Sequence, residues 1–353
     1  MVFLNNFQEG KMGFDRGQLG IVTCNSGKVF ADAMVEYLKD KYRREHLEER
    51  FRYIQSTETH FANGEIKTSI DEPVRGMDVY VVQLMDDPLS PYSVNDNLMA
   101  LATAVNAAHN SDAASVTAVI PQFPNARQER RKGRESVTAS MVASFIEASG
   151  ASRVLTIDIH AEAISGFFHI ARLDNLHASR QLMNSMNKRN LITENTVVVA
   201  PDVGSAETAR YYSRALQTDM ALIVKERDYS KASTVVDTKL VGSVDGKDVV
   251  IVDDMIATGG TLIAACQKLN EFGAKNIDVF CTFPFFNGDA VAKLDKAHAD
   301  GFVRSVTGTN AVMRGEDFKK AHPWYHEVDV ARFFAKVVYS INHMESISNV
   351  LES

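Results

Sequence analysis

A pair of adjacent acidic residues followed by a glycine-rich loop is the part of the sequence best suited to chemistry. In the stretch VVIVDDMIATGGTL (residues 249–262), an apolar run leads directly to Asp253 and Asp254. If a helix starts in the loop that follows, its free N–H groups and its dipole favour an anion such as phosphate. Carboxylates repel phosphate, so we expect the acidic pair to hold neutral hydroxyls of the same ligand. The stretch therefore predicts a sugar phosphate site, whose loop contains Ala257, Thr258, Gly259, Gly260 and Thr261.

This loop differs from the two commonest phosphate-binding motifs. No lysine follows its glycines as in a Walker A loop, and the sequence has no GxGxxG pattern for a dinucleotide. An acidic pair with Thr-Gly-Gly-Thr is also compatible with a plain strand end and a helix cap. On this stretch alone, both interpretations stay open.

Two cationic residues lie at the end of another apolar run, MALIVKE (residues 220–226). Because side chains alternate along a strand, Lys225 and Arg227 would share one face and Glu226 would take the other. Two cations on one face can clamp a phosphoryl group during transfer. Ordinary surface charge at a strand end is the alternative.

A histidine and a basic segment are further candidates. His160 follows the apolar run RVLTIDI, although a single histidine is more often a hydrogen-bonded structural residue than a ligand. The segment ARQERRKGRES (residues 126–136) concentrates positive charge in a chain that is acidic on average. Such runs are often solvated surface loops, so the segment is ambiguous by itself.

The elements that must position these residues alternate between strands and helices. Helix-period segments lie between the β-branched runs, and this alternation predicts parallel sheets covered by helices, an α/β fold. In such sheets ligands bind beyond the carboxyl ends of the strands, where Asp253, Asp254 and His160 would emerge. Two such sets predict two domains, divided into residues 1–172 and 173–353. The β-branched runs are GMDVYVVQ, SVTAVIP, RVLTIDI, TVVVAP, MALIVK, DVVIVDD and NIDVFCTF.

The first set contains a partial echo of the acidic stretch. VYVVQLMDDPLSPYSVNDNL (residues 79–98) also runs from an apolar strand through Asp-Asp and a loop into a helical segment. It lacks the TGGT segment, and chance produces such a match about as easily as a shared ancestral plan.

Composition limits the classes of function. The chain has 353 residues and a formal net charge of −7, so no overall basic field attracts nucleic acid or anionic lipid, and we expect small ligands. Its three cysteines are far apart with no CxxC pair, as in a protein of a reducing compartment. No apolar run reaches the roughly 18–20 residues of a membrane-spanning helix. We expect a cytoplasmic enzyme without a membrane or nucleic-acid partner.

Several motifs in order give the sequence a family resemblance. The motifs are FANGE (61–65), VNDNLM (94–99), ARQERRKGRES (126–136), DIHAEAISGFF (158–168), APDVGSAETAR (200–210) and VKERD (224–228). Together with the acidic stretch, they resemble the ribose-phosphate diphosphokinases, a family of the phosphoribosyltransferase fold. The match covers most of residues 20–350, although the chain reads DDMIATGGT where the family usually reads DDMIDTAGT.

The resemblance implies a role for each candidate residue. Lys225 and Arg227 would stabilise the transition state, and His160 and Asp202 would hold Mg²⁺ together with the phosphates of ATP. The ribose 5-phosphate residues would be Asp253, Asp254 and the loop 257–261. The ATP-binding residues would be Phe61, Asn63 and Glu65, which reach adenine from a neighbouring subunit, and Arg127, Gln128 and His160.

The implied reaction joins ATP and ribose 5-phosphate to give phosphoribosyl diphosphate and AMP. The resemblance also implies a homo-oligomer, either a dimer or a hexamer built from dimers, and two phosphoribosyltransferase-like domains. Two other functions remain open: a phosphoribosyltransferase that consumes phosphoribosyl diphosphate, and a catalytically silent homologue that regulates an active enzyme.

Overall fold

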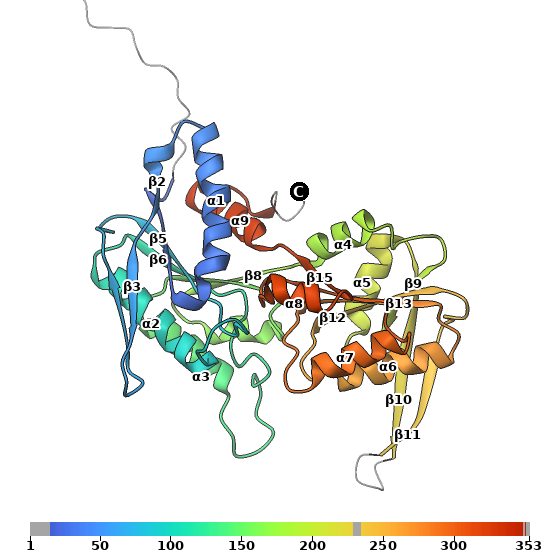
Figure 1. Cartoon of the computed structure of the whole chain (residues 1–353). Helices are drawn as coiled ribbons and strands as arrows, with labels where there is room; N and C mark the ends of the chain where they lie inside the picture. Colours follow the sequence, from blue (N-terminus) through green and yellow to red (C-terminus); the bar gives the residue numbers. More distant parts are fainter. Residues whose placement is uncertain (1–14, 229–233, 349, 351–353) are drawn as a thin grey trace, which may run out of the picture.

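The chain forms two parallel sheets that lie side by side, each covered by helices (Figure 1). The structure is a computed structural model, and it describes residues 15–228, 234–348 and 350. This arrangement confirms the predicted α/β class. Each predicted β-branched run lies on a strand, because such residues pack well on a sheet that is buried on both faces.

The first sheet has six strands within the described residues, all of them parallel. Their spatial order is β2 (Phe51–Tyr53), β1 (Leu19–Thr23), β5 (Asp78–Val82), β6 (Ser115–Val119), β7 (Arg153–Ile157) and β8 (Arg172–Leu176). The helices that follow these strands are α1 (Lys28–Arg44), α2 (Val94–Asn110) and α3 (Thr138–Ala148), with short 3-10 turns at Asn25–Gly27, Glu48–Arg50 and Glu162–Phe167. Helix α2 begins with a capping box in which Ser93 and Asp96 satisfy each other's backbone N–H groups.

The second sheet has seven strands in the described part of the chain, and only β11 runs antiparallel to its neighbour. Their order is β11 (Thr234–Val241), β10 (Asp219–Asp228), β9 (Thr196–Ala200), β12 (Asp248–Met255), β13 (Asn276–Phe283), β14 (Ser305–Thr309) and β15 (Tyr325–Val328). The helices of this part of the chain are α4 (Ser179–Lys188), α5 (Ala206–Leu216), α6 (Gly260–Glu271), α7 (Ala290–Ala299), α8 (Gly315–Ala321) and α9 (Ala331–Asn342).

Two hairpins extend away from the sheets. Strands β3 (Ser56–His60) and β4 (Ile66–Ile70) form a separate antiparallel pair beside α2, and β10 and β11 continue past the second sheet (Figure 1). The sequence predicted neither hairpin. The strands β3 and β4 carry polar residues rather than an apolar run.

The two sheets share one strand plan. The order β2-β1-β5-β6-β7-β8 in the first sheet matches β10-β9-β12-β13-β14-β15 in the second, with every neighbouring pair parallel in both. Strands β5 and β12 therefore hold equivalent places, and each leads to an Asp-Asp pair, Asp86 with Asp87 and Asp253 with Asp254. This match favours a shared plan over chance for the echo seen in the sequence.

The two halves are joined more closely than the predicted division at residues 172 and 173 implies. That division falls inside β8, a strand that pairs with β7 in the first sheet. Helix α9, late in the chain, packs against α1 of the first half, where the rings of Phe30 and Phe334 lie 5.6 Å apart. The Tyr42 hydroxyl also donates to Asn342 Oδ1 at 3.2 Å. The last helix therefore completes the core of the first half.

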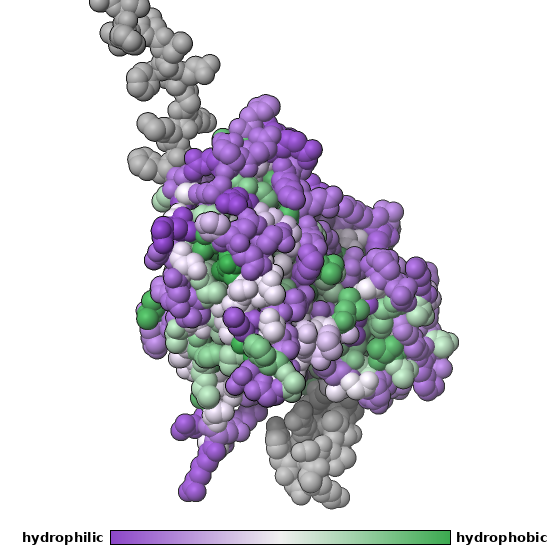
Figure 2. Space-filling model, turned by 60° about the vertical axis from the view of Figure 1, so that its left-hand side comes forward, coloured by the Kyte–Doolittle hydropathy of each residue, from purple (hydrophilic) through white to green (hydrophobic). Residues whose placement is uncertain are grey.

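The surface is mostly hydrophilic on the face shown in Figure 2, with hydrophobic residues in small separate patches. Among the described residues, no helix combines the length and the apolar character needed to span a bilayer.

Candidate functional site

A cavity of about 820 Å³ lies between the two halves, where strands of both sheets end. Its walls come from the end of β8 and the segments after β7 and β8 in the first half, and from β12, β13, α4, α5 and the segment after β9 in the second. Polar side chains gather here because the buried strands end and the chain reaches solvent, as the α/β rule predicts. The residues used below that line this cavity are Asp158, Ile159, His160, Asn175, His177, Asp202, Ser205, Asp253, Asp254 and Thr282.

The acidic pair predicted from the sequence lies in this cavity. The backbone N–H of Asp254 donates to Asp253 Oδ1 at 2.9 Å. Burial raises the pKa of Asp253 to about 7, and the negative charges of Asp254 and Asp202 add to that shift. A pair in which one carboxyl keeps its proton near neutral pH can both accept hydrogen bonds from hydroxyls and donate one.

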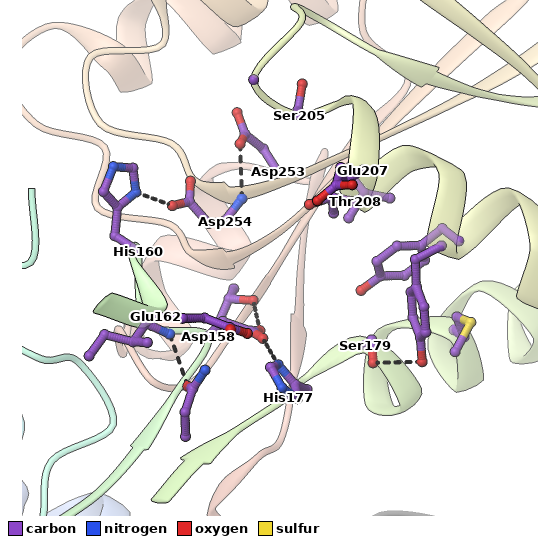
Figure 3. A pocket seen from close by; sticks show the side chains of 18 of the residues that line it. Asp158, His160, Glu162, His177, Ser179, Ser205, Glu207, Thr208, Asp253 and Asp254 are labelled. Carbon is purple, nitrogen blue, oxygen red and sulfur yellow. Dashed lines mark hydrogen bonds and ion pairs between the residues drawn. The ribbon is translucent and has the colours of Figure 1, made fainter. Parts of the chain in front are cut away.

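His160 joins the first half to this pair (Figure 3). Its Nδ1 donates to Asp254 Oδ2 at 2.6 Å, across the boundary between the halves. This hydrogen bond raises the pKa of His160 above its ordinary value. The structure thus brings His160 to the acidic pair, although His160 and Asp254 are 94 positions apart in the sequence.

Asp202 lies close to the pair at the start of α5. Its Oδ1 accepts hydrogen bonds from the N–H of Ser205 at 3.1 Å and from the Ser205 hydroxyl at 3.2 Å. Among the residues that the structure describes, no three His, Cys, Asp or Glu side chains are grouped closely enough to hold a metal by themselves. Mg²⁺ keeps several non-protein ligands, so His160 and Asp202 fit that ion only together with phosphate oxygens and water.

The glycine-rich loop lies at the end of the same strand as the acidic pair. Gly259 has a φ of +71°, which glycine adopts without strain, and α6 starts at Gly260 with no side chain capping it. A Cβ atom added to Gly260 would meet nothing within 4 Å, so the helix start is open to a ligand. Residues 257–261 are not among those that line the cavity itself.

Arg127 lies at the edge of the site. Its guanidinium donates from Nε to the sulfur of Met255 at 2.8 Å, and Met255 directly follows the acidic pair. Its positive charge also opposes the rise in the pKa of His160. Gln128 beside it is exposed, and its amide donates to Asn125 Oδ1 at 3.4 Å.

The FANGE residues lie elsewhere, in the turn of the β3–β4 hairpin. Phe61 is 47% exposed, and none of Phe61, Asn63 and Glu65 lines the cavity. The turn is closed locally, since the N–H of Phe61 donates to the carbonyl of Glu65 at 2.9 Å. A single chain therefore does not bring these residues to the site.

Lys225 and Arg227 occupy alternate positions on β10, as predicted. Lys225 pairs in register with Thr238, and the register shifts between Glu226 and Arg227 because β11 contains one extra residue there. Their side chains lie outside the described part of the structure.

Sequence reasoning missed Asp158 and His177, which also line the cavity. The pair forms an ion pair with His177 Nδ1 3.1 Å from Asp158 Oδ1, and this hydrogen bond raises the pKa of His177 (Figure 3). Their positions could have indicated them, because Asp158 directly follows β7 and His177 directly follows β8.

Comparisons with known proteins show which family the chain resembles. Residues 19–150 match the family described as the N-terminal domain of ribose phosphate pyrophosphokinase, and residues 171–312 match the phosphoribosyl transferase domain. The ribose-phosphate pyrophosphokinase of Wolinella succinogenes is 36% identical over 84% of this chain and 90% of its own length. That of Buchnera aphidicola subsp. Acyrthosiphon pisum is 38% identical over 83% of this chain and 89% of its own length. The crystal structure of phosphoribosylpyrophosphate synthetase from Mycobacterium smegmatis matches with a TM-score of 0.78 and 29% identity, over 92% of this chain and 98% of that one.

Proposed function

The chain belongs to the ribose-phosphate pyrophosphokinase family, and we propose that its reaction takes place in the cavity between the two halves. The enzyme transfers the diphosphate group of ATP to the anomeric hydroxyl of ribose 5-phosphate, giving phosphoribosyl diphosphate and AMP. The observation that supports this location best is the contact of His160 with Asp254, because it joins the residue that we expect to bind the nucleotide to one that we expect to bind ribose.

The second half would bind ribose 5-phosphate. Asp253 and Asp254 hold the 2- and 3-hydroxyls, since a pair with one proton near neutral pH offers both donors and acceptors. The backbone N–H groups of the loop 257–261 and of the start of α6 would bind the 5-phosphate. Gly260 has no side chain, which leaves room for the phosphate there. The anomeric carbon then faces the first half.

The first half would bind the nucleotide. His160 lines the cavity, and Arg127 contacts Met255, which directly follows the acidic pair, so its guanidinium would offset phosphate charge. Gln128, the next residue, would contact the same nucleotide. His160 and Asp202 would hold Mg²⁺ together with phosphate oxygens, and the ion would neutralise phosphate charge when it is bound. Phe61, Asn63 and Glu65 are exposed on a hairpin away from the cavity, so they would reach the adenine of a second copy in a homo-oligomer, a dimer or a hexamer.

The chemistry needs positioning and charge neutralisation rather than a covalent intermediate. The anomeric hydroxyl attacks the β-phosphorus of ATP in line, and AMP leaves. Lys225 and Arg227 on β10 would offset the charge that develops on the transferred group. We place the enzyme in the cytoplasm, where its three buried, unpaired cysteines fit a reducing environment.

Phosphorus NMR of the purified chain with ATP, ribose 5-phosphate and Mg²⁺ tests this function. We expect a diphosphate ester on the sugar and AMP in equal amounts, without any nucleobase. A phosphoribosyltransferase would release no AMP from this mixture, and a silent homologue would bind both substrates without turnover. Either of these two results would contradict the proposal.

A further inference from the structure

We propose that Thr282 is a positioning residue for this reaction. Through the carboxylate of Asp158, it holds the segment that carries His160 in place against the acidic pair of the other half. This inference rests on the proposed function of the cavity and adds a residue to it.

The carboxylate of Asp158 accepts three hydrogen bonds from the protein. Its Oδ1 accepts from His177 Nδ1 at 3.1 Å, and its Oδ2 accepts from the N–H of Ala178 at 3.1 Å and from Thr282 Oγ1 at 2.6 Å. Asp158 also has a φ of +41°, a conformation that is uncommon for non-glycine residues. The hydrogen bonds of its side chain help to hold this conformation.

The segment 158–160 is otherwise fixed to its own half. The N–H of Asp158 donates to the carbonyl of Leu176 at 2.8 Å, and the N–H of Ile159 donates to Asn175 Oδ1 at 3.0 Å. Both partners belong to the region of β8 in the first sheet. Thr282 is the partner of Asp158 that comes from the second sheet, so its hydroxyl sets where the segment lies relative to that sheet.

Thr282 is itself held firmly in the second sheet. It is 2% exposed, and its carbonyl accepts from the hydroxyl of Thr309 at 2.6 Å. It directly follows Cys281, which pairs in register with Asp253 across β12 and β13. The hydrogen bond from Thr282 to Asp158 therefore connects the segment of His160 to the strands that carry the ribose carboxylates.

The contact of His160 with Asp254 cannot take this role throughout a reaction cycle. Both residues have substrate contacts in the proposed function, so their bond must change when substrates enter. Asp158 and Thr282 keep their protein partners, and in-line transfer depends on alignment to within about 1 Å. The hydrogen bond between Thr282 and Asp158 therefore persists when substrates bind, and it keeps the two half-sites aligned.

Replacing the hydroxyl tests the inference. Thr282→Val keeps the size of the side chain and removes the donor, whereas Thr282→Ser keeps the donor. We expect Thr282→Val to lower the single-turnover rate by roughly 10- to 100-fold. A loss of that size corresponds to the free energy of one hydrogen bond to a charged group. We expect its dissociation constants for ribose 5-phosphate and for a magnesium complex of a non-hydrolysable ATP analogue to stay nearly unchanged, because each half-site is intact. Thr282→Ser should restore most of the rate.

A matched control separates positioning from general stability. Thr196 is also 2% exposed, and its hydroxyl donates to the carbonyl of Leu191 at 3.1 Å within the second half, away from the cavity. Thr196→Val should lower the midpoint of thermal unfolding and keep the single-turnover rate. Where Thr282→Val does not fold, Thr282→Ala, which also lacks the hydroxyl, is compared with Thr282→Ser.

Three results would overturn the inference. They are a normal rate in Thr282→Val, a loss of substrate affinity that accounts for the whole effect, and an equal loss of rate in Thr196→Val. A wild-type chain that forms no AMP would overturn the proposed function and this inference with it. An active wild type beside an equally active Thr282→Val would overturn the inference alone.

Discussion

Asp253 and Asp254 are neighbours with different surroundings, and the difference determines how each responds to pH and to substitution. Asp253 is the more buried and carries a pKa raised to about 7, whereas Asp254 is hydrogen-bonded to His160. One carboxyl therefore keeps its proton up to near neutral pH in the free protein, while the other is hydrogen-bonded to an imidazole.

The raised pKa of Asp253 predicts a pH-dependent stability for the free protein. The folded chain holds this proton more tightly than the unfolded chain, whose aspartates have pKa values of about 3.9. Stability from this group is complete below pH 4, falls as pH rises toward 7, and changes little above that. Urea unfolding between pH 4 and 8 should show a steeper fall for the wild type than for Asp253→Asn, which does not titrate. Identical pH profiles for the two proteins would contradict the prediction.

Loss of the Asp254 carboxylate should damage the reaction and spare the fold. Asp254→Asn weakens both the contact with His160 and the proposed contact with a ribose hydroxyl, so we expect kcat/KM for ribose 5-phosphate to fall roughly 100-fold or more. The matched control is Asp87→Asn, because Asp87 follows β5, the strand equivalent to β12, and accepts only a local N–H from Leu89. Steady-state kinetics in which both variants lose activity equally would contradict the assignment.

At the scale of elements, the two hairpins carry residues whose roles in the reaction are proposals. The β3–β4 hairpin carries the FANGE turn, and the β10–β11 hairpin carries Lys225 and Arg227. Hairpins that extend from a sheet can reach a neighbouring subunit or a bound substrate, so each makes a separate prediction.

Removing the aromatic ring of Phe61 should affect only the nucleotide. Phe61 is 47% exposed, so Phe61→Ala should leave the unfolding temperature unchanged. Loss of one aromatic contact with a base costs about 1–3 kcal/mol, which predicts a rise of roughly 5- to 150-fold in KM for ATP and little change in KM for ribose 5-phosphate. Equal changes in both KM values would contradict a role in binding adenine.

Removing the charge of Lys225 should affect the chemical step. We expect Lys225→Ala to lower turnover by roughly 100-fold or more while circular dichroism shows an unchanged fold. Lys275→Ala is the control, because Lys275 is exposed at the opposite, amino end of the second sheet, just before β13. Near-normal turnover in Lys225→Ala would exclude the proposed role.

Much of this element plan could be predicted from the sequence. The apolar runs of β5, β6, β7, β9, β12 and β13 were clear because each strand is covered on both faces. The strand β8 was missed because RLDNL has no apolar run, and its place in the sheet comes from pairing with β7.

The acidic pair was found because its chemistry is local to one stretch. The partners of Asp158 could not be found, because Thr282 is 124 positions away and reaches it only through the packing of the two halves.

At the scale of the whole molecule, α9 makes the two halves depend on each other. Phe334 is fully buried against Phe30, and the side chain of Asn342 donates to the carbonyl of Gly17 and to Asp78 Oδ2, both at 3.1 Å. The first half is thus completed by residues that follow the last strand of the second sheet. The even division expected from the sequence does not describe two independent units.

A core substitution in α9 should therefore destabilise the first half. Phe334→Ala removes a large buried side chain, and we expect a loss of roughly 3–5 kcal/mol in the free energy of unfolding. Calorimetry of this variant should show the transition that includes α1 shifted to lower temperature. An unchanged transition for the first half, with only the second half destabilised, would contradict this dependence.

The place of α9 in the chain also has a consequence for synthesis. A ribosome releases the strands of the first sheet long before residues 331–342 emerge, so the side of α1 that packs against α9 stays uncovered while the second sheet is being made. Chaperones that recognise exposed apolar segments have their longest opportunity during this interval. A nascent chain that terminates early would keep that side of α1 uncovered and become a substrate for quality-control proteases.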